Sequence, residues 1–338
     1  MSITFHKCPN CGGDIFFDPI TQNGKCQSCS STFSVEELEE VSYRNDKAYN
    51  TNLYKCPSCG AEIIADSTTT VTFCCYCNGP IILSDKMEGE FKPSKIIPFK
   101  YNKENAIEEF LKWSKKKWFV PNEFTSYKQL EKISGVYIPF WLVDSNINTE
   151  VVAEARKVKT WSSGDYRYTK TDIYHVYRNA KMAFDKVPGN ASTKANDEIM
   201  ESIEPFNKEE IKDFSMSYLP GFIAEKYDKP KERVLPKIKN KIDYIAKDIV
   251  TNSINGYSSV SVIRRSIDYE KIECEYALLP IWMLVYSHNG KNYTFAMNGE
   301  TGKVFGELPI SITKLGIMFI IVTVIVFILL FGGGLFIW

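Results

Sequence analysis

The stretch CPNCGGDIFFDPITQNGKCQSC, from Cys8 to Cys29, returns as CPSCGAEIIADSTTTVTFCCYC, from Cys56 to Cys77. A shift of 48 residues superposes the two copies without a gap. Each copy holds two cysteines three positions apart, fourteen further residues and a second such pair. The repeat therefore aligns eight thiols, which are Cys8, Cys11, Cys26 and Cys29 in the first copy and Cys56, Cys59, Cys74 and Cys77 in the second.

This spacing is typical of metal binding. Two cysteines three apart on a tight turn can direct both sulfurs at one ion, and a short hairpin brings the second pair opposite the first. Gly12 and Gly60 follow the second cysteine of each copy and tolerate the positive φ that such a turn requires. In the first copy IFFD and TQNG predict a strand and a turn; in the second, EIIAD and TTTVTF predict the two strands of one hairpin.

The sequence thus predicts two zinc ribbons, residues 1–34 and 53–84, joined by a linker over 35–52. Each unit is too small to be stable through its own core, and one structural Zn²⁺ contributes on the order of 10 to 16 kcal/mol. Four thiolates leave no open position on the ion, so both sites are predicted to be structural, with no catalytic or cofactor-binding residue. The alternative, redox-active Cys-x-x-Cys motifs, is disfavoured because four such motifs stand here in ribbon spacing.

The two remaining cysteines are not predicted to be ligands. Cys75 lies beside Cys74, and exchange of ligand duty between them would break the three-residue spacing. Cys274 is predicted to be a core residue. No apolar segment typical of a secretory signal opens the chain, so we expect the cysteines to stay in a reducing cytoplasm, where crowded thiols indicate metal before disulfides.

A membrane span is predicted at the other end of the sequence. Residues 315–338 read LGIMFIIVTVIVFILLFGGGLFIW and hold no charge. As a helix they would reach about 36 Å, enough for a hydrocarbon core of about 30 Å. Lys314 precedes the span and no basic residue follows it. The positive-inside bias therefore predicts a single-pass, tail-anchored membrane protein with its N-terminal region in the cytoplasm.

Charge argues against nucleic acid as the partner of the ribbons. Residues 1–90 hold 6 Lys or Arg and 12 Asp or Glu, and eight thiolates with two zinc ions add four negative charges, which gives about −10 in all. The one basic run, Lys115, Lys116 and Lys117, lies outside the ribbons. We predict that these lysines form the solvated face of a helix, with contact to anionic lipid headgroups as the alternative.

Residues 98–310, after a linker over 85–97, predict an α+β domain rich in antiparallel strands. Helices are expected at 103–118, 194–204 and 237–253, and strands at 136–143, 150–159, 166–187 and from 257 onward. HNGKN at 288–292 predicts a hairpin turn, and NGETG at 298–302 a second turn. YIPFWLV near Trp141 is similar to LLPIWML near Trp282, which predicts two equivalent buried strands of one sheet, with a binding groove as the alternative.

Several blocks of this chain resemble a family of bacterial membrane proteins with TFIIB-type zinc ribbons, of the YdjG kind. The blocks are CPNCGGD, CPSCGAEI, IIPFKYNKENA, KWFVPNEF, GVYIPFWLVD, SYLPGFIAEKYD and LLPIWMLVYSHNGKNYTFAMNGETGKVFGELP. Such proteins are often labelled as relatives of a primosomal helicase, but only the cysteine motifs support that label, because the sequence holds no ATP-binding loop. The resemblance implies a zinc-bearing cytoplasmic region on a bacterial plasma membrane and an adaptor linked to envelope stress.

The expected function is therefore that of a membrane-anchored adaptor or scaffold that binds other proteins and is not an enzyme. No GxGxxG, GK[ST], HExxH or GxSxG motif occurs, and no small-molecule substrate is predicted. Two alternatives stay open: a nucleic-acid-binding protein at the membrane, and a hydrolase in residues 98–310 that no motif reveals.

Overall fold

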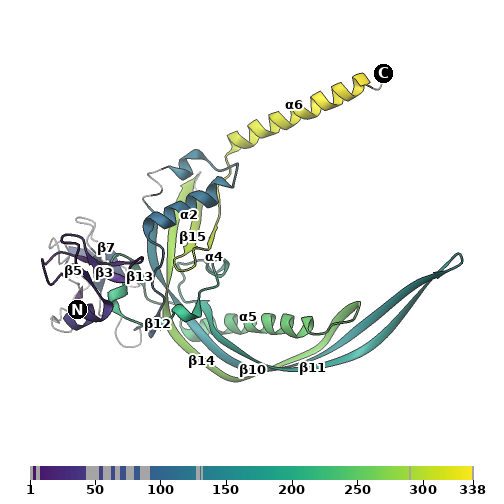
Figure 1. The fold of residues 1–338 in the computed structure, drawn as a ribbon, viewed down its shortest axis with the longest axis horizontal. Helices are drawn as coiled ribbons and strands as arrows, with labels where there is room; N and C mark the ends of the chain where they lie inside the picture. The colour runs from purple at the N-terminus through teal and green to yellow at the C-terminus, as the bar shows by residue number, and fades with distance from the viewer. Residues whose placement is uncertain are drawn as a thin grey trace.

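The computed structural model describes residues 3–4, 8–42, 53–55, 62–64, 69–73, 80–83, 92–126, 130, 132–288 and 291–336. It shows a mixed α+β protein built on a curled, mostly antiparallel sheet, with a small cysteine unit on one side of the body and a helix that projects from the top of the body (Figure 1). The α-helices are α1 Val35–Ser42, α2 Lys103–Lys115, α4 Asp197–Ser202, α5 Lys231–Asn252 and α6 Ile312–Phe336.

Most strands belong to one sheet of eleven, in the order β1-β8-β7-β13-β10-β14-β15-β16, with β11 paired to β10 and β9 to both β12 and β14. Its members are β1 Ile3–Thr4, β7 Thr69–Phe73, β8 Pro80–Leu83, β9 Lys95–Ile96, β10 Ser134–Ser163, β11 Tyr166–Asn190, β12 Lys212–Asp213, β13 Ile223–Glu225, β14 Ser259–His288, β15 Lys291–Asn298 and β16 Val304–Gly306. Two small sheets are made by β2 Ile15–Asp18, β3 Asn23–Cys26 and β4 Thr32–Phe33, and by β5 Leu53–Lys55 and β6 Glu62–Ile64. Single 3₁₀ turns lie at Asn122–Thr125, Lys208–Glu210 and Met216–Tyr218.

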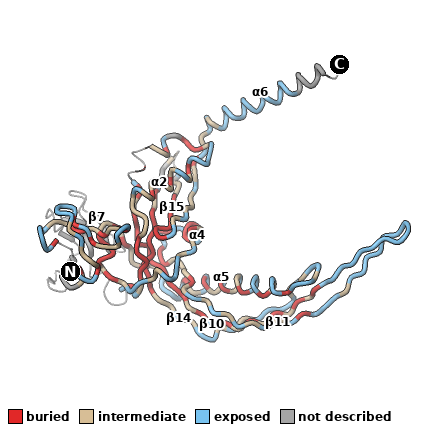
Figure 2. The backbone as a smooth tube through the Cα atoms, in the orientation of Figure 1, coloured by how far each residue is buried: buried red, intermediate tan, exposed pale blue. Residues whose placement is uncertain are grey.

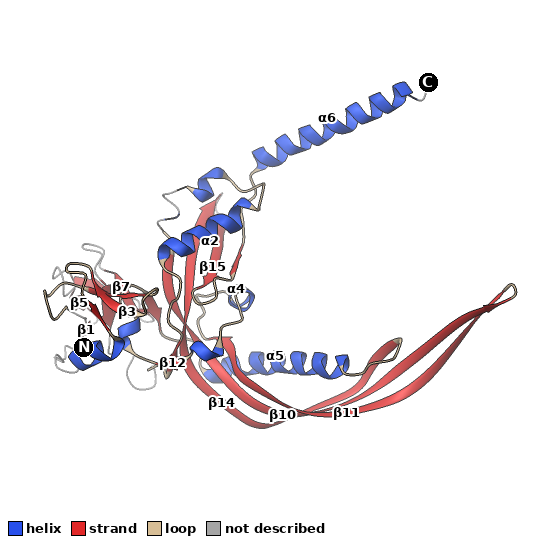
Figure 3. Ribbon diagram, in the orientation of Figure 1, coloured by secondary structure: helices blue, strands red, loops and turns tan. Residues whose placement is uncertain are grey.

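Three strands are much longer than the body of the protein requires. β10, β11 and β14 run side by side out of the body as a curved arm, and α5 lies along the inside of its curve (Figures 1 and 3). Near the body the strands are buried on both faces, whereas the far end of the arm is exposed (Figure 2). The strands predicted at 136–143 and 150–159 are parts of one strand, because the residues between them continue β10 through a bulge.

The core occupies both faces of the sheet where it crosses the body. One face packs aromatic side chains against α2 and α5, including Phe99 stacked on Phe222 at 4.1 Å between ring centroids. The other face packs against α4 through Ile199 and Met200. A third cluster, with Ala153 at its centre, fills the space between the arm and the end of α5. Burial of such side chains contributes roughly 25 cal/mol per Å² of apolar surface and is the main force holding α5 to the arm.

The predicted helices are all present with shifted ends. α2 ends at Lys115 rather than 118, and α5 begins at Lys231, six residues before the predicted start. The prediction of α5 rested on the spacing of isoleucines from Ile238 onward, whereas Val234 is also buried against the sheet and the helix extends through Pro236 to include it. α1 occupies part of the stretch expected as a linker.

Two strand predictions have opposite outcomes. The hairpin between β14 and β15 is confirmed, since His288 pairs with Lys291. The single hairpin predicted for EIIAD and TTTVTF is wrong: β6 pairs with β5, while β7 pairs with β8 and with β13. The physical reason is that β13 supplies a sheet edge that residues 62–73 alone do not reveal, and β7 satisfies its backbone groups there.

The two similar Pro-x-Trp segments are strands of one sheet, as predicted, and the structure shows that they are direct neighbours. Tyr137 of β10 pairs with Pro280 of β14, and Trp141 pairs with Tyr276. Both tryptophans are buried, and each indole N–H donates a 3.0 Å hydrogen bond to a backbone carbonyl, Trp141 to Lys229 and Trp282 to Tyr101. Both side chains are thus structural anchors, and Trp282 in addition borders the cleft beside the cysteine unit that is described below.

Candidate metal centre

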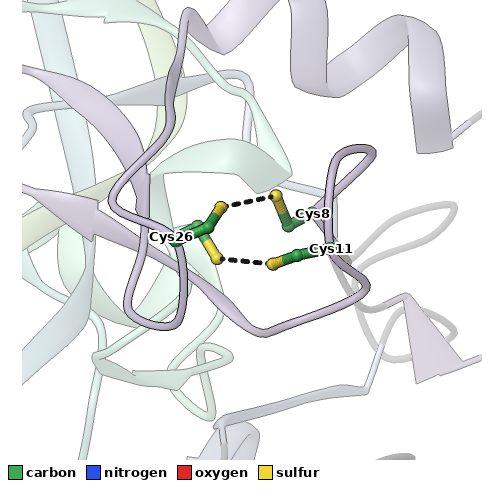
Figure 4. A group of neighbouring side chains, drawn as sticks. Cys8, Cys11 and Cys26 are labelled. Atoms are coloured by element: carbon green, nitrogen blue, oxygen red, sulfur yellow. Dashed lines mark hydrogen bonds between the residues drawn. The ribbon is translucent and has the colours of Figure 1, made fainter.

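The first cysteine unit, residues 8–33, brings its four predicted ligands together. All four sulfur atoms lie within 4.8 Å of one another, and the Cys8–Cys29 and Cys11–Cys26 sulfurs are each 3.5 Å apart. Figure 4 shows the side chains of Cys8, Cys11 and Cys26 converging from two loops. A tetrahedron of thiolates around zinc at about 2.3 Å has edges of about 3.8 Å, so the arrangement fits a four-coordinate ion.

Two turns of the same geometry hold the sulfurs. In the first, Gly12 N–H donates to the Cys8 carbonyl at 2.8 Å; in the second, Ser30 N–H donates to the Cys26 carbonyl at 3.0 Å. Gly12 has a φ of 72° and Ser30 a φ of 60°, so both turns use the left-handed region immediately after the second cysteine. The predicted positive φ at Gly12 is therefore confirmed, and Ser30 adopts it without glycine.

Backbone N–H groups also contact the sulfurs. The N–H of Gly13 is directed at Cys11, and the N–H and hydroxyl of Ser31 are directed at Cys29. Such bonds favour the thiolate, which is the metal-binding form. The Ser31 hydroxyl and N–H lower the pKa of Cys29 to about 6, whereas, despite the bond from Gly13, the neighbouring Cys29 and Cys26 sulfurs raise the pKa of Cys11. Sequence reasoning missed Ser31, because a serine two positions after a cysteine carries no motif of its own.

The donor set determines what the cluster can do. Zinc prefers four thiolates in a tetrahedron, and Cys8 and Cys26 are almost fully buried beneath Cys11 and Cys29. The cluster could therefore hold a metal ion, and four protein ligands leave no place for a water or substrate on it. When bound, the ion would supply a crosslink between the two turns.

The second predicted site cannot be placed in the same way. Its ligands Cys56, Cys59, Cys74 and Cys77, and the neighbouring Cys75, lie outside the described residues. The strands β6 and β7, which lie between the two cysteine pairs, are described. Cys274 is half-buried and packs against the main core, and burial raises the pKa of its thiol. This position agrees with its predicted place in the core.

The first cysteine unit is joined to the body rather than separate from it. Phe17 is buried, its N–H donates a 2.9 Å hydrogen bond to the Pro220 carbonyl, and its ring meets Tyr218 edge-on at 5.2 Å. The amide of Gln22 donates to the Phe99 carbonyl at 2.7 Å. A cleft of about 610 Å³ lies between the unit and the sheet, lined by Phe16, Asn102, Lys103, Glu104 and Trp282 among others.

The projecting helix α6 is the second candidate element. Its window Ile312–Leu329 has a mean hydropathy of 2.7 and none of it is buried, so the helix is long and apolar enough to cross a membrane. Its start is fixed to the loop after α2, because Ser311 N–H donates to the Phe119 carbonyl and Lys314 Nζ to the Val120 carbonyl, each at 2.7 Å. Lys115, Lys116, Lys117 and Trp118 are exposed in that loop.

Comparison with known proteins gives a family but no activity. No protein-family model and no solved structure matches the chain. The chain is 42% identical over 321 residues to YdjG of Bacillus subtilis (strain 168), described as an uncharacterized protein, and the alignment covers 94% of this chain and 93% of YdjG. With that identity along almost the full length of both proteins, the chain belongs to the YdjG family.

Proposed function

We propose that this chain is a membrane-anchored adaptor that carries two structural zinc ions and binds other proteins at the cytoplasmic face of a bacterial plasma membrane. The observation that carries the proposal is the combination, in one chain, of a closed four-cysteine cluster and an apolar helix with no surface buried. Neither feature offers a reactive centre, whereas both are suited to holding a binding surface in a fixed place. A role in the response to envelope stress is the setting that the family resemblance suggests.

The contacts at the start of α6 support one orientation of the chain in the membrane. If α6 crosses the bilayer, its bonds to Phe119 and Val120 hold Lys115, Lys116 and Lys117 at headgroup depth, where cations favour the anionic cytoplasmic leaflet. Trp118, which is 77% exposed, would lie in the same interface. We therefore propose that this loop contacts lipid and that the body stays in the cytoplasm.

Protein is favoured over nucleic acid as the partner because of charge. Residues 8–42, which include the described cysteine unit and α1, hold one lysine and six acidic side chains. Thiolates around a divalent ion would add two further negative charges. A binder of phosphate backbones needs the opposite sign.

Membrane anchoring is tested by extracting membranes of cells that express the full chain or a variant ending at Ser311. We expect the full chain to resist alkaline carbonate and the shortened variant to appear in the soluble fraction. Release of the full chain by carbonate would contradict the anchor.

Partner binding is tested by crosslinking in cells that express wild type, Cys8→Ser/Cys11→Ser or Cys274→Ser. Cys274 is a matched control because it lies outside the cluster. We expect the double variant to lose specific crosslinked proteins that wild type and Cys274→Ser both retain. Identical partners for all three proteins would show that the first cysteine unit is not a docking surface.

A further inference from the structure

The arm ends in a two-stranded ribbon that the rest of the fold does not use. β14 begins opposite Arg156, so residues 157–172, here called the arm tip, have only each other as strand partners. Gly164, with a φ of 56°, makes the tight turn between β10 and β11. In the part of the chain that the structure describes, neither α5, which ends at Asn252, nor a third strand covers this ribbon. Its side chains are therefore free to meet something outside the chain.

One face of the arm tip gathers three aromatic rings. Trp161 pairs across the strands with Tyr168, and their rings stack at 5.7 Å with an angle of 15°. Tyr166 stands two positions from Tyr168 and thus on the same face. The exposed fractions are 50% for Trp161, 46% for Tyr168 and 72% for Tyr166. Such exposure of large rings at one place marks an interaction surface.

Cations stand beside these rings. Lys159 and Lys170 pair across the strands on the aromatic face, next to Trp161 and Tyr168. Lys170 is also 3.1 Å from Asp172. The whole arm tip contains four basic side chains and two acidic ones, which are Asp172 and, at the turn, Asp165. The arm tip therefore carries a net charge of +2 around an aromatic centre.

We propose that the arm tip docks on the anionic lipid headgroups of the membrane that α6 crosses. Tryptophan and tyrosine with lysine and arginine are the residues that settle at a bilayer interface, where the rings enter the headgroup layer and the cations meet anionic lipid. In Figure 1, α6 and the arm both extend away from the side of the body that carries the cysteine unit. The proposal rests on the proposed anchoring by α6, because the tether makes the second contact intramolecular and a weak surface is then sufficient.

The test uses the full chain in vesicles with brominated lipids, which quench the fluorescence of tryptophans that touch lipid. The vesicles hold phosphatidylcholine alone or phosphatidylcholine with phosphatidylglycerol. The signal of Trp161 is obtained as the difference between wild type and Trp161→Phe, a variant that keeps a ring to stack on Tyr168. Trp118→Phe gives the signal at the base of α6 as an internal reference.

We expect Trp118 to be quenched in both vesicles and Trp161 only in the anionic ones. Each cation at an anionic surface contributes roughly a fivefold factor to the equilibrium, so Lys159→Gln/Lys170→Gln should weaken docking on the order of 25-fold and abolish the Trp161 signal. Trp161 left unquenched in anionic vesicles while Trp118 is quenched overturns the arm-tip contact alone. Quenching of neither residue overturns the anchoring as well. A Trp161 response to an oligonucleotide instead of to lipid would make the arm tip a nucleic-acid surface and overturn the proposal.

Discussion

Ser30 and Gly12 occupy equivalent places in the two turns of the metal cluster, yet only one of them was predictable. A positive φ costs a residue with a side chain roughly 1 to 2 kcal/mol, which is why glycine after Cys11 is a signal and serine after Cys29 is not. The four ligands themselves were predictable because a hairpin of about twenty residues encodes their spacing locally. The fold accepts this conformational cost at Ser30 because of the bonds that the turn makes. The Ser30 N–H donates to the Cys26 carbonyl, and the Ser31 N–H is directed at the Cys29 sulfur.

Replacement of one buried ligand tests the cluster. Cys8→Ser removes a thiolate that is 3% exposed, so three sulfurs remain and the crosslink between the two turns is lost. We expect the metal content of the purified chain, measured by mass spectrometry, to fall by about one ion per chain. Cys274→Ser should leave the content unchanged, and full metal in Cys8→Ser would refute the assignment.

At the scale of elements, the limit of sequence reasoning lies in the contacts between distant segments. The periodicity of Ile238, Ile242, Ile245 and Ile249 predicted α5, because a helix is encoded by its own residues. The joining of the cysteine unit to the sheet depends on Tyr218 and Pro220, about 200 positions after Phe17. No local pattern encodes such a pairing, so the unit was predicted as a ribbon but its docking was not.

That docking can be measured through Phe17. Phe17→Ala removes a ring that is 4% exposed and part of the main core, and we expect the free energy of unfolding to fall by about 3 to 4 kcal/mol. Ile20→Ala, on the same unit but 59% exposed, should change it by less than about 0.5 kcal/mol. Denaturant titration of detergent-solubilised protein compares the two. Equal effects would mean that the unit does not pack on the body.

The stability of the contact between α4 and α5 should depend on pH through Asp197, the first residue of α4. Asp197 accepts hydrogen bonds from Lys229 at 2.8 Å, from Asn190 at 2.7 Å and from Lys237. Burial raises its pKa, but the two lysines and Asn190 outweigh burial and bring the pKa to about 2. A lowered pKa stabilises the fold above the usual carboxyl value near 4, and this stabilisation is lost as the pH falls from about 4 to about 2.

Asp197→Asn should therefore cost about 1 to 2 kcal/mol of unfolding free energy at pH 7, and the difference from wild type should shrink toward zero between pH 4 and pH 2. Asp213→Asn is the matched control, because its partner Lys95 is also 2.8 Å away but the Asp213 side chain is 91% exposed. Its effect on the unfolding free energy should be much smaller than that of Asp197→Asn, because solvent screens the exposed ion pair. If the loss of unfolding free energy in Asp197→Asn did not change with pH, the loss would come from packing rather than from the charge of Asp197.

At the scale of the whole molecule, the arm sets the shape. β10 was predicted as two pieces, at 136–143 and 150–159, but Lys186, with a φ of 51°, donates its N–H to Asp144 at 2.7 Å and the ladder continues past the bulge. The alternation of apolar and polar residues shows that a strand exists. It does not show that three strands leave the body together.

The arm should become less protected along its length. Val151 and Ala153 are fully buried between the strands and α5, whereas the arm tip has no cover. We expect amide hydrogen exchange, read by mass spectrometry of peptides, to be at least tenfold faster in residues 157–172 than in residues 147–153. Uniform protection would indicate that the arm tip is held by another contact in the purified protein.

The continuity of β10 and β14 from the core to the arm has a mechanical consequence. Each of these strands runs from the body into the arm without a break. A force along the arm therefore acts in shear on many of the hydrogen bonds between the strands at once, rather than breaking them one after another. A displacement at the far end is then transmitted to the sheet that also holds β13 and, through it, β7. We therefore expect the arm to move as one stiff unit relative to the body.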